Sequence, residues 1–142
     1  MTPRPGGNCS AGGFYQNGAR RNQAFVVSEV NGTWHNAVEV PGTAALNKGG
    51  IALVVAVSCG SAGNCGAGGA YLDSSGHYQA FVVSEVSGTW RTAIEVPGTA
   101  ALDKGWDAQV NSVSCASAGN CSAGGFYPDN SQHSHAFVVS ES

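Results

Sequence analysis

The stretch from Asn8 to Gly13, which reads Asn-Cys-Ser-Ala-Gly-Gly, decides the fold because it occurs three times. It returns at 64–69 as Asn-Cys-Gly-Ala-Gly-Gly and at 120–125 as Asn-Cys-Ser-Ala-Gly-Gly, so the period is 56 residues. Aligned without gaps, residues 8–63 match residues 64–119 at 36 of 56 positions. The chain is therefore an array of repeats, and its fold has to be built from one repeated unit.

Each full repeat is predicted to contain four short strands. In the second period these strands cover residues 52–58, 65–72, 79–86 and 90–96. The run before Cys59 is almost continuously apolar, which is typical of a strand buried on both faces. Asn31-Gly32 is a strong signal for a tight hairpin between the third and fourth strands, and Pro97-Gly98 is expected to end the fourth strand.

Composition agrees with an all-β chain and excludes some classes of partner. Glycine accounts for 21 of the 142 residues, as expected for short strands joined by tight turns. Only six residues are Lys or Arg and the net charge is −3, so no basic stripe exists for a nucleic acid. The longest apolar run, residues 51–57, is too short to span a membrane.

Four short antiparallel strands in every repeat predict the blades of a β-propeller. A β-solenoid is the alternative, but its coils are usually shorter and would not need hairpin turns at these places. We expect one array over residues 1–142. Residues 8–51 supply the second to fourth strands of one blade, residues 52–97 a complete blade, and residues 107–142 the first three strands of another.

Two and a half blades with ten strands cannot close a ring, because a propeller typically needs at least about four blades. Either the chain is a piece of a longer protein, or copies of it associate until a ring forms. We prefer a homodimer, since closed two-fold association is the commonest case.

The repeat resembles the kelch repeat. The matching features are Gly68-Gly69 at the end of the second strand, Glu85 in the third strand and Trp90 at the start of the fourth. This resemblance implies a β-propeller, although the repeated cysteines depart from the kelch pattern. The repeat also resembles Cys-containing repeats in secreted actinobacterial proteins, a resemblance that implies no function.

Four cysteines form two pairs at the same phase of the repeat, Cys59 with Cys65 and Cys115 with Cys121. Each pair flanks a tight turn between antiparallel strands, which favours a disulfide. A zinc site is the alternative, but it would need four ligands and no His lies near either pair in sequence. We therefore expect no metal or cofactor, and a secreted or extracellular protein. The N-terminal residues lack the apolar segment of a secretory signal, so we expect any export signal to lie outside this chain.

Cys9 has no partner at the expected position. It aligns with Cys65, so its partner would lie at position 3, which is Pro3. We therefore expect the chain to begin just after the place of a first strand. Cys9 is then free, paired between chains, or paired after strand exchange.

Positions that differ between the copies gather in two loops, one between the second and third strands and one before the next first strand. In an up-and-down blade both loops lie at the same end, and we interpret this end as a ligand face. Its aromatic, amide and charged groups suit a sugar or a polar peptide, and drift in exposed loops is the alternative. The candidate residues are Arg20, Arg21, Asn22, Asp73, His77, Tyr78, Lys104, Trp106, Asp107, Asp129, His133 and His135.

No nucleophile motif, phosphate-binding loop or zinc-protease motif occurs in the sequence. Glu29, Glu85 and Glu141 occupy identical positions in the copies, whereas a glycosidase needs two differently placed carboxylates. We expect these glutamates to accept hydrogen bonds from backbone donors. The first hypothesis is a non-enzymatic extracellular module that binds a glycan or a protein. The alternative is a structural, self-assembling propeller fragment with no dedicated ligand.

Overall fold

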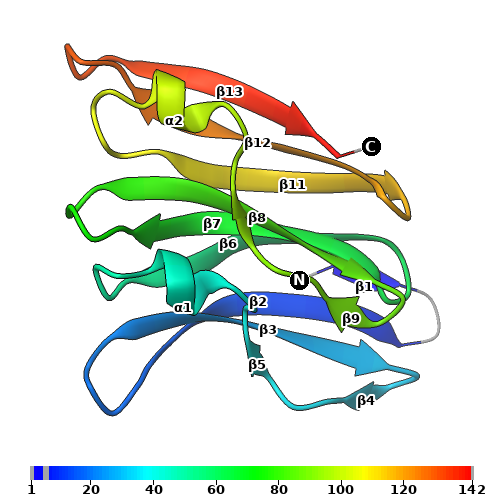
Figure 1. Ribbon diagram of the computed structural model, residues 1–142. Coiled ribbons are helices and arrows are strands. Elements are labelled where there is room, and N and C mark those ends of the chain that lie inside the picture. The colour runs from blue at the N-terminus through cyan, green and yellow to red at the C-terminus, as the bar shows by residue number, and fades with distance from the viewer. Residues whose placement is uncertain (1, 5–6, 142) are drawn as a thin grey trace.

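The computed structural model describes residues 2–4 and 7–141, which form three antiparallel sheets stacked as layers (Figure 1). The first sheet contains β1 (Thr2–Arg4), β2 (Asn8–Gln16), β3 (Asn22–Val30), β4 (Thr33–Trp34) and β5 (Val38–Glu39). The second contains β6 (Ala52–Ser61), β7 (Asn64–Leu72), β8 (Tyr78–Val86), β9 (Thr89–Trp90) and β10 (Ile94–Glu95). The third contains β11 (Gln109–Ser117), β12 (Asn120–Pro128) and β13 (Ser134–Ser140). The protein is all-β, and each sheet in the described part of the chain is open.

Two expectations about the strands are wrong. The fourth strand of each full repeat is split into two short strands, so that β9 and β10 both pair with β8. The first sheet does contain a first strand, because β1 pairs with β2 and places Pro3 opposite Cys9. The described residues therefore form 13 strands instead of ten.

Two one-turn helices, α1 (Thr43–Leu46) and α2 (Thr99–Leu102), follow the Pro-Gly pairs and were not expected from the sequence. Gly42 and Gly98 precede them with φ angles of 89° and 90°, a left-handed conformation that glycine adopts at little cost. The Thr43 side chain is buried and donates a hydrogen bond to the Val40 carbonyl at 2.7 Å. In the described residues neither helix has the length or the hydrophobicity to cross a bilayer.

The hydrophobic core lies between the sheets, and each sheet buries a face only where another sheet covers it. We call the face toward the following repeat the leading face and the face toward the preceding repeat the trailing face. Val26, on the leading face of the first sheet, is 0% exposed, whereas its equivalent Val138, on the leading face of the third sheet, is 87% exposed. Similarly, Tyr71 on the trailing face of the second sheet is 3% exposed, and its equivalent Tyr15 in the first sheet is 41% exposed.

The Gly-Gly pair in the second strand of the second sheet, Gly68-Gly69, has two separate tasks. A Cβ atom on Gly68 would lie 2.6 Å from Cγ1 of Val110, so this glycine lets the third sheet approach the second. A Cβ atom on Gly69 would overlap the carbonyl oxygen of Leu53, beside the bulge between Val54 and Ala56. Both positions therefore require the absence of a side chain, one between sheets and the other within a sheet.

Both cysteine pairs are at disulfide distance. The S–S separation is 2.04 Å for Cys59–Cys65 and 2.05 Å for Cys115–Cys121. Each pair joins directly opposed residues of neighbouring strands, and the Cα atoms are 3.9 Å apart, closer than is usual for a disulfide. Cys9 forms no disulfide with any of the described residues.

This arrangement predicts how many thiols react. In the native protein at most one of the five cysteines should react with a chromogenic disulfide reagent, because the other four are oxidised. All five should react after reduction in denaturant. Three or more reactive thiols in the native protein would contradict the pairing.

The two glycines of a pair can be tested by a matched substitution. Gly69→Ala should destabilise the fold by about 3 kcal/mol, since the new methyl group can be accommodated only if the backbone of β6 moves. Gly13→Ala is the control, because a Cβ atom there would meet only the Phe25 ring, at 3.2 Å. Urea unfolding measures both variants, and equal losses of stability would refute this role for Gly69.

Candidate functional site

The candidate site is the end of the stack at which the variable loops meet. The β2–β3, β7–β8 and β12–β13 loops lie at this end together with α1 and α2 (Figure 1). The short turns between β6 and β7 and between β11 and β12 lie at the opposite end. The strands therefore hold the loops that differ between repeats at one end.

The first residue of each long loop fixes the loop's shape. The side-chain Oδ1 atoms of Asn17, Asp73 and Asp129 each accept hydrogen bonds from the backbone amides two and four residues further along the chain, at 2.8–3.0 Å. Such side-chain-to-backbone hydrogen bonds satisfy backbone amides that have no strand partner in the loop. Asp73 and Asp129 thus have a structural role in addition to any contact with a ligand.

Asp129 also lies beside two histidines, His133 in the same loop and His135 near the start of β13. Its Oδ2 atom lies 2.8 Å from Nε2 of His135 and 3.8 Å from Nδ1 of His133, and the His135 ring stacks on Tyr127. The hydrogen bond from His135, followed by that from the His133 backbone, lowers the pKa of Asp129 to about 2. The described residues contain no cluster of three or more His, Cys, Asp or Glu side chains suited to a metal.

A stacked aromatic pair, with Trp106 exposed and His77 partly buried, links the β7–β8 loop to the segment between α2 and β11. The His77 and Trp106 rings stack with centroids 4.2 Å apart and planes inclined by 13°. The Tyr78 amide donates to the Trp106 carbonyl, and Tyr78 forms a parallel bridge with Asp107, so these four candidate residues are neighbours. Trp106 is 44% exposed.

Trp106 adopts a left-handed backbone conformation, with φ of 68°. Its equivalent in the preceding loop is Gly50, with φ of 89°. A bulky residue in this region is strained, and such strain is concentrated at functional sites. Gly50 instead contacts the side chain of Arg21, the equivalent of His77.

The other candidates are spread along the loop end. Arg20 and Lys104 are exposed, and the Asn22 amide donates to the Gly50 carbonyl at 2.9 Å. The structure therefore brings the candidates together in three groups, one for each long loop. None of the twelve lines either of the two cavities between the sheets.

A buried carboxylate, that of Asp103, is hydrogen-bonded to the residue after Trp106 and was missed by the sequence analysis. Asp103 is fully buried, its Oδ1 atom accepts from the Asp107 amide at 3.1 Å, and its Oδ2 atom has no partner. Burial, followed by the charge of Asp103, raises the pKa of Asp107. The only sign of the buried carboxylate in the sequence was the change from Asn47 to Asp103 between the copies. This change could not be interpreted from the sequence, because its meaning depends on whether residue 103 is buried.

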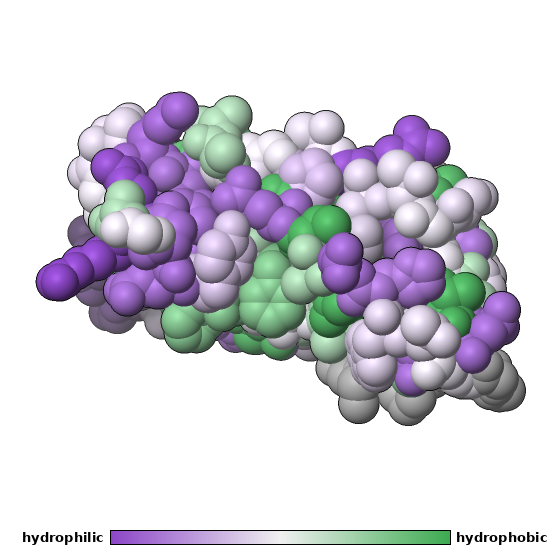
Figure 2. Space-filling view, turned by 90° about the horizontal axis from the view of Figure 1, so that it is seen from below, coloured by the Kyte–Doolittle hydropathy of each residue, from purple (hydrophilic) through white to green (hydrophobic). Residues whose placement is uncertain are grey.

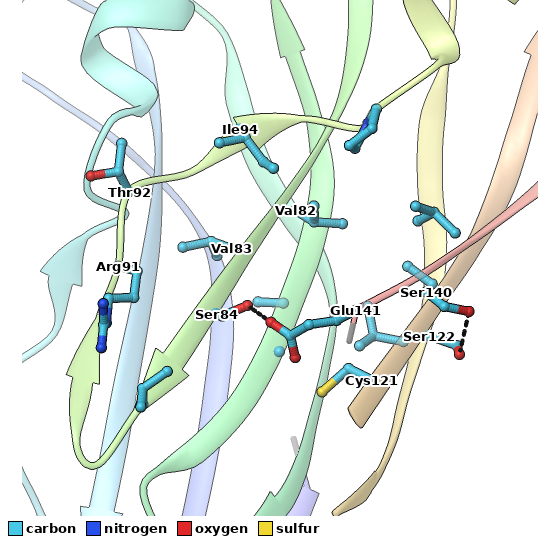
Figure 3. A pocket seen from close by; sticks show the side chains of 17 residues that line it. Val82, Val83, Ser84, Arg91, Thr92, Ile94, Cys121, Ser122, Ser140 and Glu141 are labelled. Atoms are coloured by element: carbon cyan, nitrogen blue, oxygen red, sulfur yellow. Dashed lines mark hydrogen bonds between the residues drawn. The ribbon is translucent and has the colours of Figure 1, made fainter. Parts of the chain in front are cut away.

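Two cavities of about 430 and 420 Å³ lie between neighbouring sheets. Figure 3 shows the larger one, with apolar walls from Val82, Ile94 and other residues and a hydrogen bond from Ser84 to Glu141. In the other cavity Ser28 donates to Oε2 of Glu85 at 3.2 Å. Burial raises the pKa of Glu85.

These contacts correct one expectation about the repeated glutamates. Glu85 and Glu141 accept hydrogen bonds from serine hydroxyl groups of the preceding sheet, whereas we expected backbone donors. The glutamates therefore link neighbouring sheets.

No protein-family model matches the chain, and a search of the curated proteins found no match.

The repeat offers its own reference for the buried carboxylate. Asn47, the equivalent of Asp103, donates from Nδ2 to Oε1 of Gln23 at 3.2 Å, whereas Oε1 of the equivalent Gln79 has no partner. Asp103→Asn should therefore raise the free energy of unfolding at pH 7 by about 1–3 kcal/mol, because it removes a buried charge and supplies a donor.

Asn47→Asp is the reciprocal control and should lower stability by a similar amount. Chemical denaturation at pH 7 measures both variants. A loss of stability in Asp103→Asn would show that the carboxylate is satisfied in some other way.

Proposed function

We propose that this chain is a non-enzymatic, extracellular, kelch-like β-propeller module that binds a glycan or a protein at its loop end. The observation that carries the proposal is the exposed Trp106 ring, held by a strained backbone and stacked on His77. A glycan is the ligand we would test first, because the apolar face of a sugar stacks on an aromatic ring while polar groups bind its hydroxyls. Tyr78, Asp107 and His77 supply polar groups beside the ring.

Extracellular location is supported by the two disulfides, since such bonds persist in oxidising compartments. The propeller is supported by three sheets of similar strand order that pack face to face. We propose that two copies of the chain close one ring. With β1 included, each copy would contribute three blades, the third without its fourth strand.

A structural, self-assembling element with no dedicated ligand is the second candidate. It is favoured by the uncovered outer faces of the first and third sheets, where Tyr15 and Val138 are exposed although their equivalents are buried. A ligand at the loop end separates the two functions, because assembly alone requires none.

Trp106 offers a direct test of the ligand face. On a glycan array, the wild-type protein should bind one class of glycan, and Trp106→Gly should bind it at least tenfold more weakly, a loss of about 1.4 kcal/mol. Glycine suits the left-handed conformation, so this variant should fold at least as stably as the wild type.

The matched control is Trp34→Ala, because Trp34 is 45% exposed on β4 and lies away from the long loops. This variant should bind as the wild type does. Absence of glycan binding by the wild type, or equal binding by Trp106→Gly, would reject the glycan proposal.

A further inference from the structure

The interface between neighbouring sheets is built twice from equivalent residues. Between the first and second sheets, Ser10 lies 3.4 Å from Sγ of Cys65, and Ser28 donates to Glu85. Between the second and third sheets, a Cβ atom on Gly66 would lie 3.2 Å from Sγ of Cys121, and Ser84 donates to Glu141. Residues 10 and 28 of one repeat thus face the cysteine and glutamate of the next.

The trailing face of the first sheet already has the shape of a covered face. Tyr15 and Phe25 lie 6.5 Å apart with rings inclined by 53°, and their buried equivalents Tyr71 and Phe81 lie 6.5 Å apart at 50°. Figure 2 views the molecule from the side of the first sheet and shows apolar side chains gathered over the middle of this face. This aromatic pair therefore already has the arrangement that its covered equivalent has.

The leading face of the third sheet carries the residues equivalent to those with which the first sheet packs on the second. Ser122 and Ser140 are the equivalents of Ser10 and Ser28, and both are exposed. Val138 lies beside this serine pair on the same face, as Val26 lies beside Ser10 and Ser28. It is the most exposed large apolar side chain in the described residues.

We propose that the leading face of the third sheet packs on the trailing face of the first sheet of a second copy of this chain. The leading face comprises Ser122, Ala136, Val138 and Ser140, and the trailing face comprises Cys9, Tyr15, Phe25, Val27 and Glu29. The contact continues the interface that the chain forms twice within itself. It places Ser140 beside Glu29 of the second copy and Ser122 beside Cys9 of the second copy.

This head-to-tail contact specifies which surfaces would join the two copies of the proposed ring. Each copy presents one leading and one trailing face, so two copies can bury all four. The contact uses no residue of the loop end, and it holds or fails independently of any ligand there. In this contact Cys9 would be buried as a thiol, and it would face Ser122 of the other copy instead of another cysteine.

A cross-link tests the contact directly. In Ser122→Cys, the new thiol should lie as close to Cys9 of the second copy as Ser10 lies to Cys65, close enough to form a disulfide. Oxidised glutathione supplies the oxidant: two protein thiols lose two electrons and two protons, and one glutathione disulfide becomes two thiols. Non-reducing electrophoresis of the full chain should then show a covalent dimer as the main product.

Three controls fix the geometry. Ser122→Cys combined with Cys9→Ser should form at most a trace of dimer. Ser131→Cys, on the exposed β12–β13 loop, should give no covalent dimer under the same conditions, and neither should the wild type. Equal cross-linking of Ser122→Cys and Ser131→Cys would overturn the proposal.

Native mass spectrometry tests the same contact without a covalent bond. The wild type should have twice the mass of one chain at micromolar concentration, and Val138→Glu should reduce it to a monomer. Because Val138 is already exposed within one copy, this variant should keep its two disulfides and its β-sheet circular dichroism. Leu102→Glu, on exposed α2, should leave the dimer intact. A folded wild-type monomer would overturn the proposal.

Discussion

The close approach of one sheet to the next is the constraint on which the rest of this structure depends. At Gly12 and Gly68 the second strand carries no side chain, and Val54 and Val110 of the following repeats fill the space, with 2.6 Å between the valine Cγ1 atom and the place of a Cβ. Because the sheets come so close, the serine of one can reach the glutamate of the next. Burial, hydrogen bonding and the position of the cavities all follow from this one contact and its repetition.

The same constraint explains why much of the variation lies in the loops, although the first strands also differ, with Leu53 and Val55 of β6 replaced by Gln109 and Asn111 in β11. A change on a covered face has to fit the neighbouring sheet as well as its own sheet, whereas a change in a loop has to fit only its own turn. Asn17, Asp73 and Asp129 keep that turn, through bonds to two backbone amides each, and leave the remaining loop positions free to differ. A stack with a constant framework can thus present different chemistry at each loop.

Local patterns in the sequence were enough to predict the hairpins and both disulfides. The Gly-rich second strands, the turns and the cysteines at equal phase involve residues near each other in the chain. What could not be predicted depends on distant residues or on weak signals. Glu85 accepts its hydrogen bond from Ser28, which lies 57 positions away. Helix α1 has only four residues and shows no apolar periodicity. Position 3 is Pro3 and not the cysteine that would have indicated β1. For the candidate site, the strand order fixed the end of the stack, but the His77–Trp106 stack and the burial of Asp103 required coordinates.

The equal register of the three central hairpins has a consequence for how the chain reaches its native state. β2 pairs with β3, β7 with β8 and β12 with β13 so that the second glycine faces the phenylalanine each time. A strand from the wrong repeat would therefore offer almost the same hydrogen bonds and side chains as the right one. Correct pairing is favoured because the β2–β3, β7–β8 and β12–β13 loops are short compared with the chain that separates strands of different repeats. The proper neighbour therefore comes into contact first, at a lower cost in chain entropy. Lengthening one of these loops would slow folding and increase strand exchange between repeats, even with every contact of the native protein unchanged.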